Sequence, residues 1–172
     1  MRRRSSEAAG PGALKTLTGL SDETICEVST ALTLLLADVF ALHVKTKGFQ
    51  WRLSGPHFRD HYRLLQEQAG QLLSMIDPLA ERVRTIGGNT VGSIGHIARL
   101  QRVRDNDIED VAPHAMLDDL RNDNAALTRR MRQAYELCDD HGDFAGAALL
   151  ARLIDEAERR VWLLFETTRR NG

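Results

Sequence analysis

The feature that most constrains the fold is a series of apolar residues spaced three and four positions apart over long stretches of the chain. In the first stretch these are Val28, Leu32, Leu35, Val39 and Leu42. Because an α-helix has about 3.6 residues per turn, this spacing puts them all on one face of a helix. Ser21 precedes Asp22 and Glu23 and is a suitable N-cap. We therefore predict an amphipathic helix from Ser21 to about Trp51, where Ser54-Gly55-Pro56 breaks it.

Three further stretches have the same spacing. The second comprises Leu65, Ala69, Leu72, Ile76, Leu79, Val83 and Ile86, and we expect one helix there although Pro78 lies within it. The third begins after Pro113 and comprises Leu117, Leu120, Asn124, Leu127, Met131, Ala134 and Cys138. The fourth comprises Leu150, Leu153, Ala157, Val161 and Leu164. With aromatic residues at 5% and only 4 prolines, the chain is predicted to be all-α.

The connection between the second and third stretches is unusually long. It runs from Gly88 to Pro113, and residues 93–100 within it have the composition of a short helix. A connection of this length lets the chain cross from one end of a bundle to the other instead of returning by a hairpin. The spacing therefore predicts a four-helix bundle with a long crossover connection that carries a short helix.

The charge is unevenly distributed along the chain. The formal net charge is −1, which by itself argues against a polyanion-binding protein. Residues 1–20, however, contain Arg2, Arg3, Arg4 and Lys15 against Glu7, a net charge of +3, which leaves −4 for the remainder. We predict a flexible basic arm over residues 1–20 and a bundle domain over residues 21–172, the alternative being an ordinary frayed terminus.

The cysteines and the apolar runs indicate a cytoplasmic protein. Cys26 and Cys138 lie far apart with no Cys-x-x-Cys spacing and fall on or near apolar stripes, so we expect two buried, unreactive thiols. The basic start lacks the apolar region of a secretory signal, and no uninterrupted apolar run approaches a membrane span.

Two pairs of side chains have the spacing of metal ligands. Asp77 and Glu81 are one helical turn apart, so their carboxylates can share a divalent cation of the kind that prefers oxygen ligands. The alternative is that Glu81 forms a surface ion pair with Arg82 or Arg84. His57 and His61 have the same spacing and could jointly bind zinc or copper.

The segment from Leu36 to Gly88 closely resembles the Dps family of mini-ferritins. The motifs are K-T-K-x-F-x-W-x-x-S-G-P-x-F over residues 45–58 and D-x-x-A-E-R-x-x-x-x-G-G over residues 77–88, supported by S-I-G-H-I in the long connection and by Trp162. The resemblance implies a ferritin-like four-helix bundle assembled into a hollow dodecamer. Members of this family oxidise Fe(II), often with hydrogen peroxide, store the ferric mineral and in some cases bind DNA through basic arms.

The resemblance also implies where iron is oxidised. The family's ferroxidase site lies at a two-fold subunit interface and uses two histidines and three acids. Aligned without gaps, its last two acids are Asp77 and Glu81, whereas Gln50, Tyr62 and Gln66 replace the other three ligands. We therefore expect weak iron binding. His61 adjoins Tyr62, but one residue rotates a helical side chain by about 100°, so it is no simple substitute.

An acid that lines the family's iron-entry pore is also replaced. The corresponding residue is Ala148, while Asp139, Asp140 and Asp143 lie nearby and are candidate pore residues. The alternative is that these three acids form a solvated turn between helices.

These features leave three interpretations. The first is a Dps-like stress-protection shell, a ferroxidase by resemblance, that binds iron through Asp77 and Glu81 with nonstandard partners such as His61 or His43. It sequesters iron and binds DNA through Arg2, Arg3, Arg4 and Lys15, in the cytoplasm or at the nucleoid. The second is a ferroxidase-deficient shell that acts as a DNA-binding or structural protein. The third is a helical interaction module.

Overall fold

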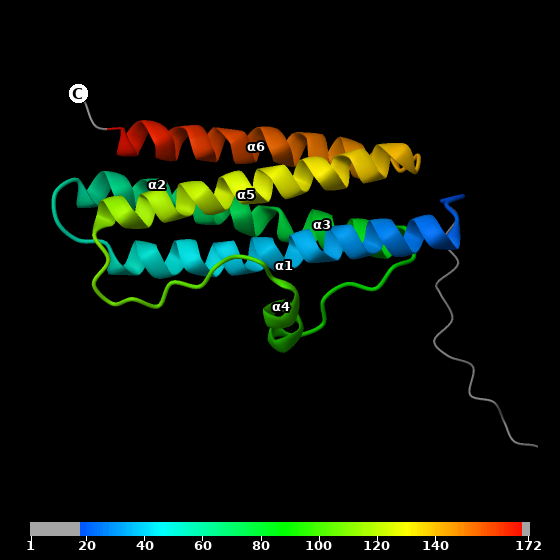
Figure 1. The fold of residues 1–172 in the computed structure, drawn as a ribbon, viewed down its shortest axis with the longest axis horizontal. Coiled ribbons are helices and arrows are strands. Elements are labelled where there is room, and N and C mark those ends of the chain that lie inside the picture. Colours follow the sequence, from blue (N-terminus) through cyan, green and yellow to red (C-terminus); the bar gives the residue numbers. More distant parts are fainter. Residues whose placement is uncertain (1–17, 170–172) are drawn as a thin grey trace, which may run out of the picture.

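The chain folds into a bundle of α-helices with no strand among the residues that the structure describes. The structure is a computed structural model that describes residues 18–169. Its helices are α1 (Asp22–Arg52), α2 (Phe58–Ser74), α3 (Ile76–Thr85), α4 (Ile94–Leu100), α5 (Pro113–Asp140) and α6 (Phe144–Thr168). Because α2 and α3 follow one another along one line, the long elements form four parallel or antiparallel rods (Figure 1). The predicted four-helix bundle is confirmed. The proposed arm residues Arg2, Arg3, Arg4 and Lys15 lie outside the described residues.

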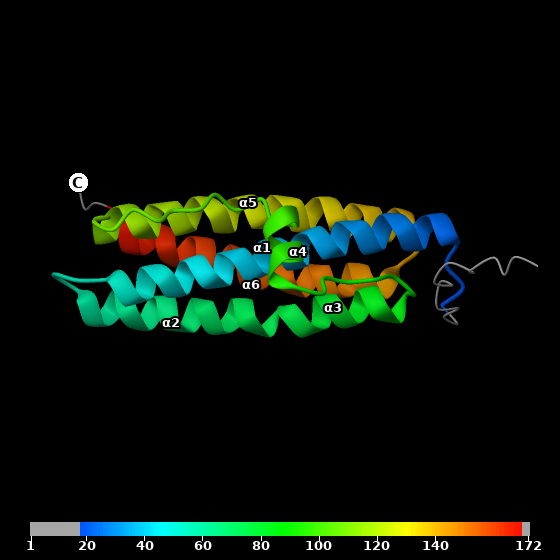
Figure 2. The same cartoon turned by 90° about the horizontal axis from the view of Figure 1, so that it is seen from below.

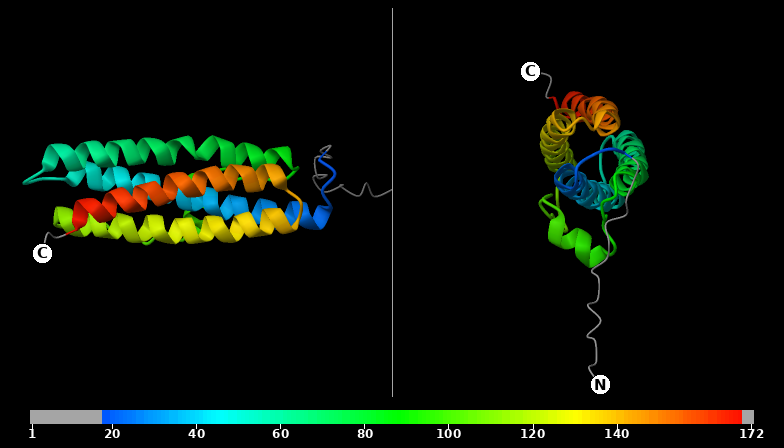
Figure 3. Two further views of the ribbon diagram at one scale, coloured as in Figure 1. Left: turned by 90° about the horizontal axis from the view of Figure 1, so that it is seen from above. Right: turned by 90° about the vertical axis from the view of Figure 1, so that its right-hand side faces the viewer.

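The crossover sets the order of helix directions. α1 and α2 run antiparallel, and after α3 the chain returns along the bundle before α5 begins, so that α2 and α5 run parallel (Figure 1). α4 lies across the outside of α1, as Figure 2 shows from a second direction. Viewed end-on in Figure 3, the four rods surround one core and α4 stands outside it. The crossover with its short helix, beginning at the N-cap Ser93, therefore agrees with the prediction.

The predicted apolar stripes form the core. All of their members on α1, α2, α3 and α5 are buried, from Val28 to Cys138. On α6 the stripe differs by one position, because Arg160 is fully buried whereas Val161 is only partly covered. The Arg160 guanidinium donates to Asn124 Oδ1 at 3.0 Å and to the Met75 sulfur at 3.5 Å. Burial lowers the pKa of this guanidinium to about 10, so it remains charged inside the bundle at neutral pH.

The expectation of a single second helix is wrong. The rod is interrupted at Met75, which separates α2 from α3. Pro78 has no N–H to donate to the carbonyl of Ser74, and its ring crowds that carbonyl, so the regular hydrogen-bond ladder ends there. Helix α3 restarts with Leu79 N–H donating to Met75 O at 3.3 Å. The apolar face nevertheless continues across the break, because Leu72, Ile76 and Leu79 are all buried.

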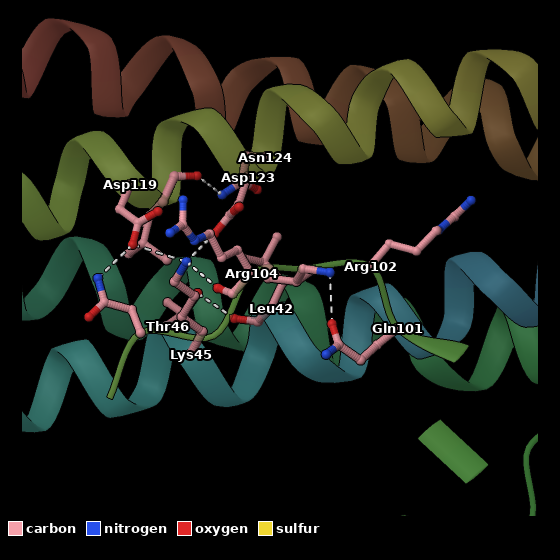
Figure 4. Close-up of polar contacts among 12 residues, drawn as sticks. Leu42, Lys45, Thr46, Gln101, Arg102, Arg104, Asp119, Asp123 and Asn124 are labelled. Atoms are coloured by element: carbon pink, nitrogen blue, oxygen red, sulfur yellow. Dashed lines mark hydrogen bonds and ion pairs between the residues drawn. The ribbon is translucent and has the colours of Figure 1, made fainter. Parts of the chain in front are cut away.

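Side chains of α1 and α5 hold the crossover against the bundle. The buried Asp38 carboxylate accepts hydrogen bonds from the Arg102 backbone N–H at 2.7 Å and from the Arg102 guanidinium at 2.7 Å, and Arg130 lies 3.2 Å away. Lys45 donates to Arg104 O at 2.8 Å and forms ion pairs with Asp119 at 3.0 Å and Asp123 at 2.6 Å (Figure 4). These charge-assisted contacts add to the apolar packing of Val103, which is buried in the core.

Helix α1 is apolar enough along its length to cross a membrane. One window of this helix has a mean hydropathy of 1.9, although polar residues interrupt its apolar sequence. Of that window, 56% is buried inside the bundle, which is the environment of a core helix.

The expectation of two buried thiols holds for one cysteine only. Cys138 is buried, whereas Cys26 is exposed because it lies off the α1 stripe. Burial, together with the nearby carboxylate of Asp143, raises the pKa of Cys138 to about 12.

Thiol labelling tests this difference. Because the thiolate is the reactive form, the native chain should release one equivalent of chromophore rapidly from Ellman's reagent, through Cys26, and a second only in urea. Cys26→Ser should remove the rapid phase. Two rapid equivalents in the native wild-type chain would contradict the burial of Cys138.

The Asp38 contacts can be tested by unfolding. Asp38→Asn removes the buried charge that Arg102 and Arg130 neutralise, and we expect it to lower the free energy of unfolding by about 2–3 kcal/mol. The matched control is Glu158→Gln, which breaks a half-exposed ion pair with Arg132 and should cost less than about 1 kcal/mol. Equal urea midpoints for the two variants would show that Asp38 does not anchor the crossover.

Candidate metal centre

Asp77 and Glu81 form an outward-facing pair of carboxylates on α3. Both are exposed, while Ile76, Leu79 and Val83 on the opposite side of the helix are buried. Because the apolar side must face the core, the i and i+4 carboxylates lie together on the outer surface. Asp77 also lies in the first turn of α3, where the helix dipole favours a negative charge. The fold thus exposes two adjacent carboxylates on the outer face of α3, where a cation can bind to both.

The arginines beside this pair are engaged elsewhere. Arg82 forms an ion pair with the buried Asp143, and Arg84 donates to Gly88 O at 2.9 Å and to Asn89 Oδ1 at 2.8 Å. Neither reaches Glu81, so the surface ion pair that the sequence allowed does not form. Within residues 18–169 no ion pair involves Asp77 or Glu81. Two like charges one turn apart repel each other, and a bound cation removes that cost.

A second group lies where α1 ends beside α2. Gln50 is buried, and its Nε2 donates to Tyr62 O at 3.4 Å, so the structure brings these two positions together. Gln66 follows one turn after Tyr62 and is exposed. The Tyr62 ring packs against Phe58 at a centroid distance of 5.5 Å.

A lysine blocks the oxygen that Gln50 offers. Lys47 Nζ donates to Gln50 Oε1 at 2.5 Å and also lies 5.5 Å from the centre of the Trp51 ring. A metal ion bound at this oxygen would meet an ammonium group that already occupies it, and the two positive charges repel. Lys47 does not belong to the ligand set that the resemblance implies, although its i, i+3 spacing from Gln50 on one helix is a signal in the sequence that the two side chains meet.

The two groups of one chain lie too far apart to hold one ion. Asp77 follows Gln66 by eleven positions, and at about 1.5 Å of rise per residue the two lie roughly 16 Å apart along the rod. A cation bound by both groups therefore needs Asp77 and Glu81 from one chain and the Gln50, Tyr62 and Gln66 surface from another. In agreement, the described residues of a single chain contain no cluster of three or more metal-binding side chains.

His61 lies on a different side of α2 from the Gln50 contact. It lines a surface pocket with Thr167 of α6, whereas Tyr62 faces α1 through Gln50. Burial, followed by the nearby His57, lowers the pKa of His61, and its Nδ1 is buried without a hydrogen-bond partner. The structure thus does not bring His61 to Gln50 within one subunit.

The three candidate pore acids differ in their surroundings. Asp139 and Asp140 are exposed at the end of α5. Asp143 is buried, caps α6 by accepting from Gly146 N–H at 2.9 Å and pairs with Arg82. A Cβ at position 146 would collide with the Asp143 carboxylate, which explains why glycine is needed there. Asp143 therefore ties the start of α6 to α3, the helix that carries Asp77 and Glu81.

Comparisons with known proteins agree with this architecture. The family described as Ferritin-like domain matches residues 29–170. A low temperature-induced protein of Nostoc sp. is 34% identical over 147 residues, which cover 85% of this chain and 82% of that protein. The DNA protection during starvation protein of Halobacterium salinarum is 30% identical over 162 residues, 91% of this chain and 84% of that protein. The solved structure of DpsC from Streptomyces coelicolor superposes with a TM-score of 0.87 at 27% identity and covers 98% of both chains.

Proposed function

Since the chain belongs to the Dps family of ferritin-like proteins, we propose that it forms a hollow shell that sequesters iron and protects the cell under stress. The observation that carries this proposal is the pair of unpartnered carboxylates, Asp77 and Glu81, on the outer face of α3. Carboxylate oxygens suit iron in both oxidation states, and their negative charge favours the more highly charged Fe(III).

In the proposed shell, iron binds between two subunits. Asp77 and Glu81 of one chain face the surface of a second chain where Gln66 is exposed, Tyr62 is partly exposed and Gln50 is buried next to Tyr62. The separation of roughly 16 Å between Gln66 and Asp77 along one rod supports this arrangement, because a single chain cannot close the site. We propose a cytoplasmic homododecamer, the assembly that the resemblance implies.

Oxidation of iron at this site should be slow. Fe(II) gives up one electron, and hydrogen peroxide accepts two electrons and two protons to become water, so two Fe(II) ions are consumed per peroxide. The site must hold the ions while this occurs, but Gln50 Oε1 is bound by the Lys47 ammonium and Gln66 is a neutral ligand. Lys47 is the observation that favours the second candidate function, a ferroxidase-deficient shell that acts through DNA or as a structural protein.

Iron would enter the shell past the acids at the end of α5. Asp139 and Asp140 are exposed and free to provide negative potential there, whereas Asp143 already neutralises Arg82. We therefore assign the pore role to Asp139 and Asp140 and a positioning role to Asp143.

The basic arm is proposed as the DNA-binding element. Arg2, Arg3, Arg4 and Lys15 give residues 1–20 a net charge of +3 on a chain whose total is −1. Such a segment can neutralise phosphates without any fixed structure of its own. Two named relatives, one from Halobacterium salinarum and one from Brevibacillus brevis, are DNA protection proteins, which supports the same role.

Restoring the missing ligands tests the iron site. Gln50→His, Tyr62→His and Gln66→Asp together should raise the initial rate of Fe(II) oxidation by about tenfold to hundredfold, because each added ligand tightens binding at the shared site. Stopped-flow absorbance of Fe(III) formation with hydrogen peroxide measures this rate in the assembled protein.

The matched control is the same triple substitution combined with Asp77→Ala. If the two subunits share one site, Asp77→Ala should return the rate to that of an iron solution without protein. A triple variant whose gain survives Asp77→Ala would contradict the pairing of the two surfaces. Rapid, saturable oxidation of Fe(II) by the wild-type chain would contradict the expectation that the site binds iron weakly.

Removing the arm tests DNA binding. Deletion of residues 1–10 removes Arg2, Arg3 and Arg4, so duplex DNA should bind more weakly, and the dependence of log K on log[salt] should become shallower by about 0.9 for each lost phosphate contact. Gel-shift titrations at several salt concentrations measure both quantities. Unchanged affinity and slope after the deletion would place DNA binding elsewhere.

A further inference from the structure

The first turn of α2 carries two histidines that have no part in the carboxylate pair. The rings of His57 and His61 lie 6.1 Å apart between centroids and are inclined by 49°. Together with Asp60, Leu64 and Thr167 of α6 they line a pocket at the surface. His61 precedes Asp77 by sixteen residues, which corresponds to roughly 24 Å along the α2–α3 rod. The histidine pocket is therefore distinct from the proposed iron site.

The backbone fixes the position of His57. Among the described residues it is the only non-glycine residue with a positive φ, 62°, in the left-handed region that a side chain with a Cβ rarely adopts. Its carbonyl accepts from the N–H groups of Asp60 and His61, both at 3.1 Å, and so begins α2. This turn keeps the His57 imidazole beside that of His61.

The charges around the pocket leave His61 suited to a cation. Its Nδ1 is buried and has no hydrogen-bond partner in the structure. Burial, followed by the neighbouring His57, lowers the pKa of His61 and so disfavours the protonated ring. The positive end of the α2 dipole opposes a cation here. The negative charge of the Asp60 carboxylate has the opposite effect, since it favours a positive charge at the His61 ring. Thr167 also lies in the last turn of α6, the negative end of that helix.

We propose that His57 and His61 bind a divalent transition-metal ion with an affinity for nitrogen ligands, such as Zn²⁺ or Cu²⁺. Two imidazoles that share an ion at metal–nitrogen distances of about 2.1 Å have ring centres about 5–6.5 Å apart, a range that includes the observed separation. The described residues contain no group of three or more potential ligands, so water completes the coordination and the ion exchanges readily.

Titration with Cu²⁺ tests the proposal because imidazole coordination has a spectroscopic signature. The full chain carrying Asp77→Asn and Glu81→Gln, which weakens the carboxylate pair, should bind one Cu²⁺ per subunit and show nitrogen hyperfine splitting in its electron paramagnetic resonance spectrum. Adding His61→Gln should weaken Cu²⁺ binding by about tenfold or more and reduce the number of nitrogen hyperfine lines, because one coordinating nitrogen is lost. His57→Asn should do the same, and asparagine tolerates the left-handed backbone at this position.

The control is His114→Gln. His114 also lies near the start of a helix, but its ring pairs with Asp118 at 3.1 Å on α5. This substitution should leave the affinity and the splitting unchanged, and circular dichroism should show every variant to be equally helical. Unchanged Cu²⁺ affinity and nitrogen splitting in the His61→Gln chain would overturn the proposal, and so would an equal loss in His114→Gln.

Discussion

A buried carboxylate, Asp38, determines where the crossover lies, and the arrangement of the outer surface depends on it. A buried carboxylate without a partner of opposite charge would be costly, and Asp38 is paired with Arg102 and Arg130. α1 supplies further contacts, because Arg52 donates to Asn106 O at 3.0 Å and Lys45 donates to Arg104 O at 2.8 Å. The crossover is thus held on the side of α1 and α5 (Figure 1), and among the described residues the outer face of α3 stays exposed. That face carries Asp77 and Glu81.

The interior of the bundle is held by a second polar contact, at the point where the second rod is interrupted. Arg160 is fully buried and donates to Asn124 and to Met75, the residue between α2 and α3. Gln68 Nε2 donates to the Arg160 carbonyl at 3.4 Å. The guanidinium bonds through Nε and Nη2, while its buried Nη1 has no partner in the structure, and these two bonds link the break in one rod to α5 and α6.

The sequence allowed prediction of the features that depend on local spacing. The stripes from Val28 to Cys138, the Ser21 cap and the crossover helix follow from residues close together in the chain. Features that depend on contacts between residues far apart in the chain could not be predicted from local spacing. Asp143 is buried and paired with Arg82, 61 positions earlier, and Arg160 is buried and donates a hydrogen bond to Asn124, 36 positions earlier. Neither partner can be recognised from helical periodicity.

The same limit applies to the candidate site. Asp77 and Glu81 were identified from their spacing, but that their neighbouring arginines are engaged elsewhere became evident only in the folded chain. The replaced position Gln50 was found from the resemblance, while the Lys47 ammonium that occupies its oxygen was missed. Pro78 was recognised as a disturbance, yet the strength of the apolar pattern suggested an unbroken helix. A strong stripe shows which side of a rod is buried and says little about whether its hydrogen bonds are continuous.

The central claim is that two subunits share one metal site built on Asp77 and Glu81. Anomalous diffraction from crystals of the assembled protein soaked with Fe(II) tests it most directly, because the signal locates the metal itself. The account predicts an anomalous peak within coordination distance of Asp77 and Glu81, facing the Gln50, Tyr62 and Gln66 surface of a neighbouring chain. Iron bound elsewhere, with no peak at these two carboxylates, would contradict it.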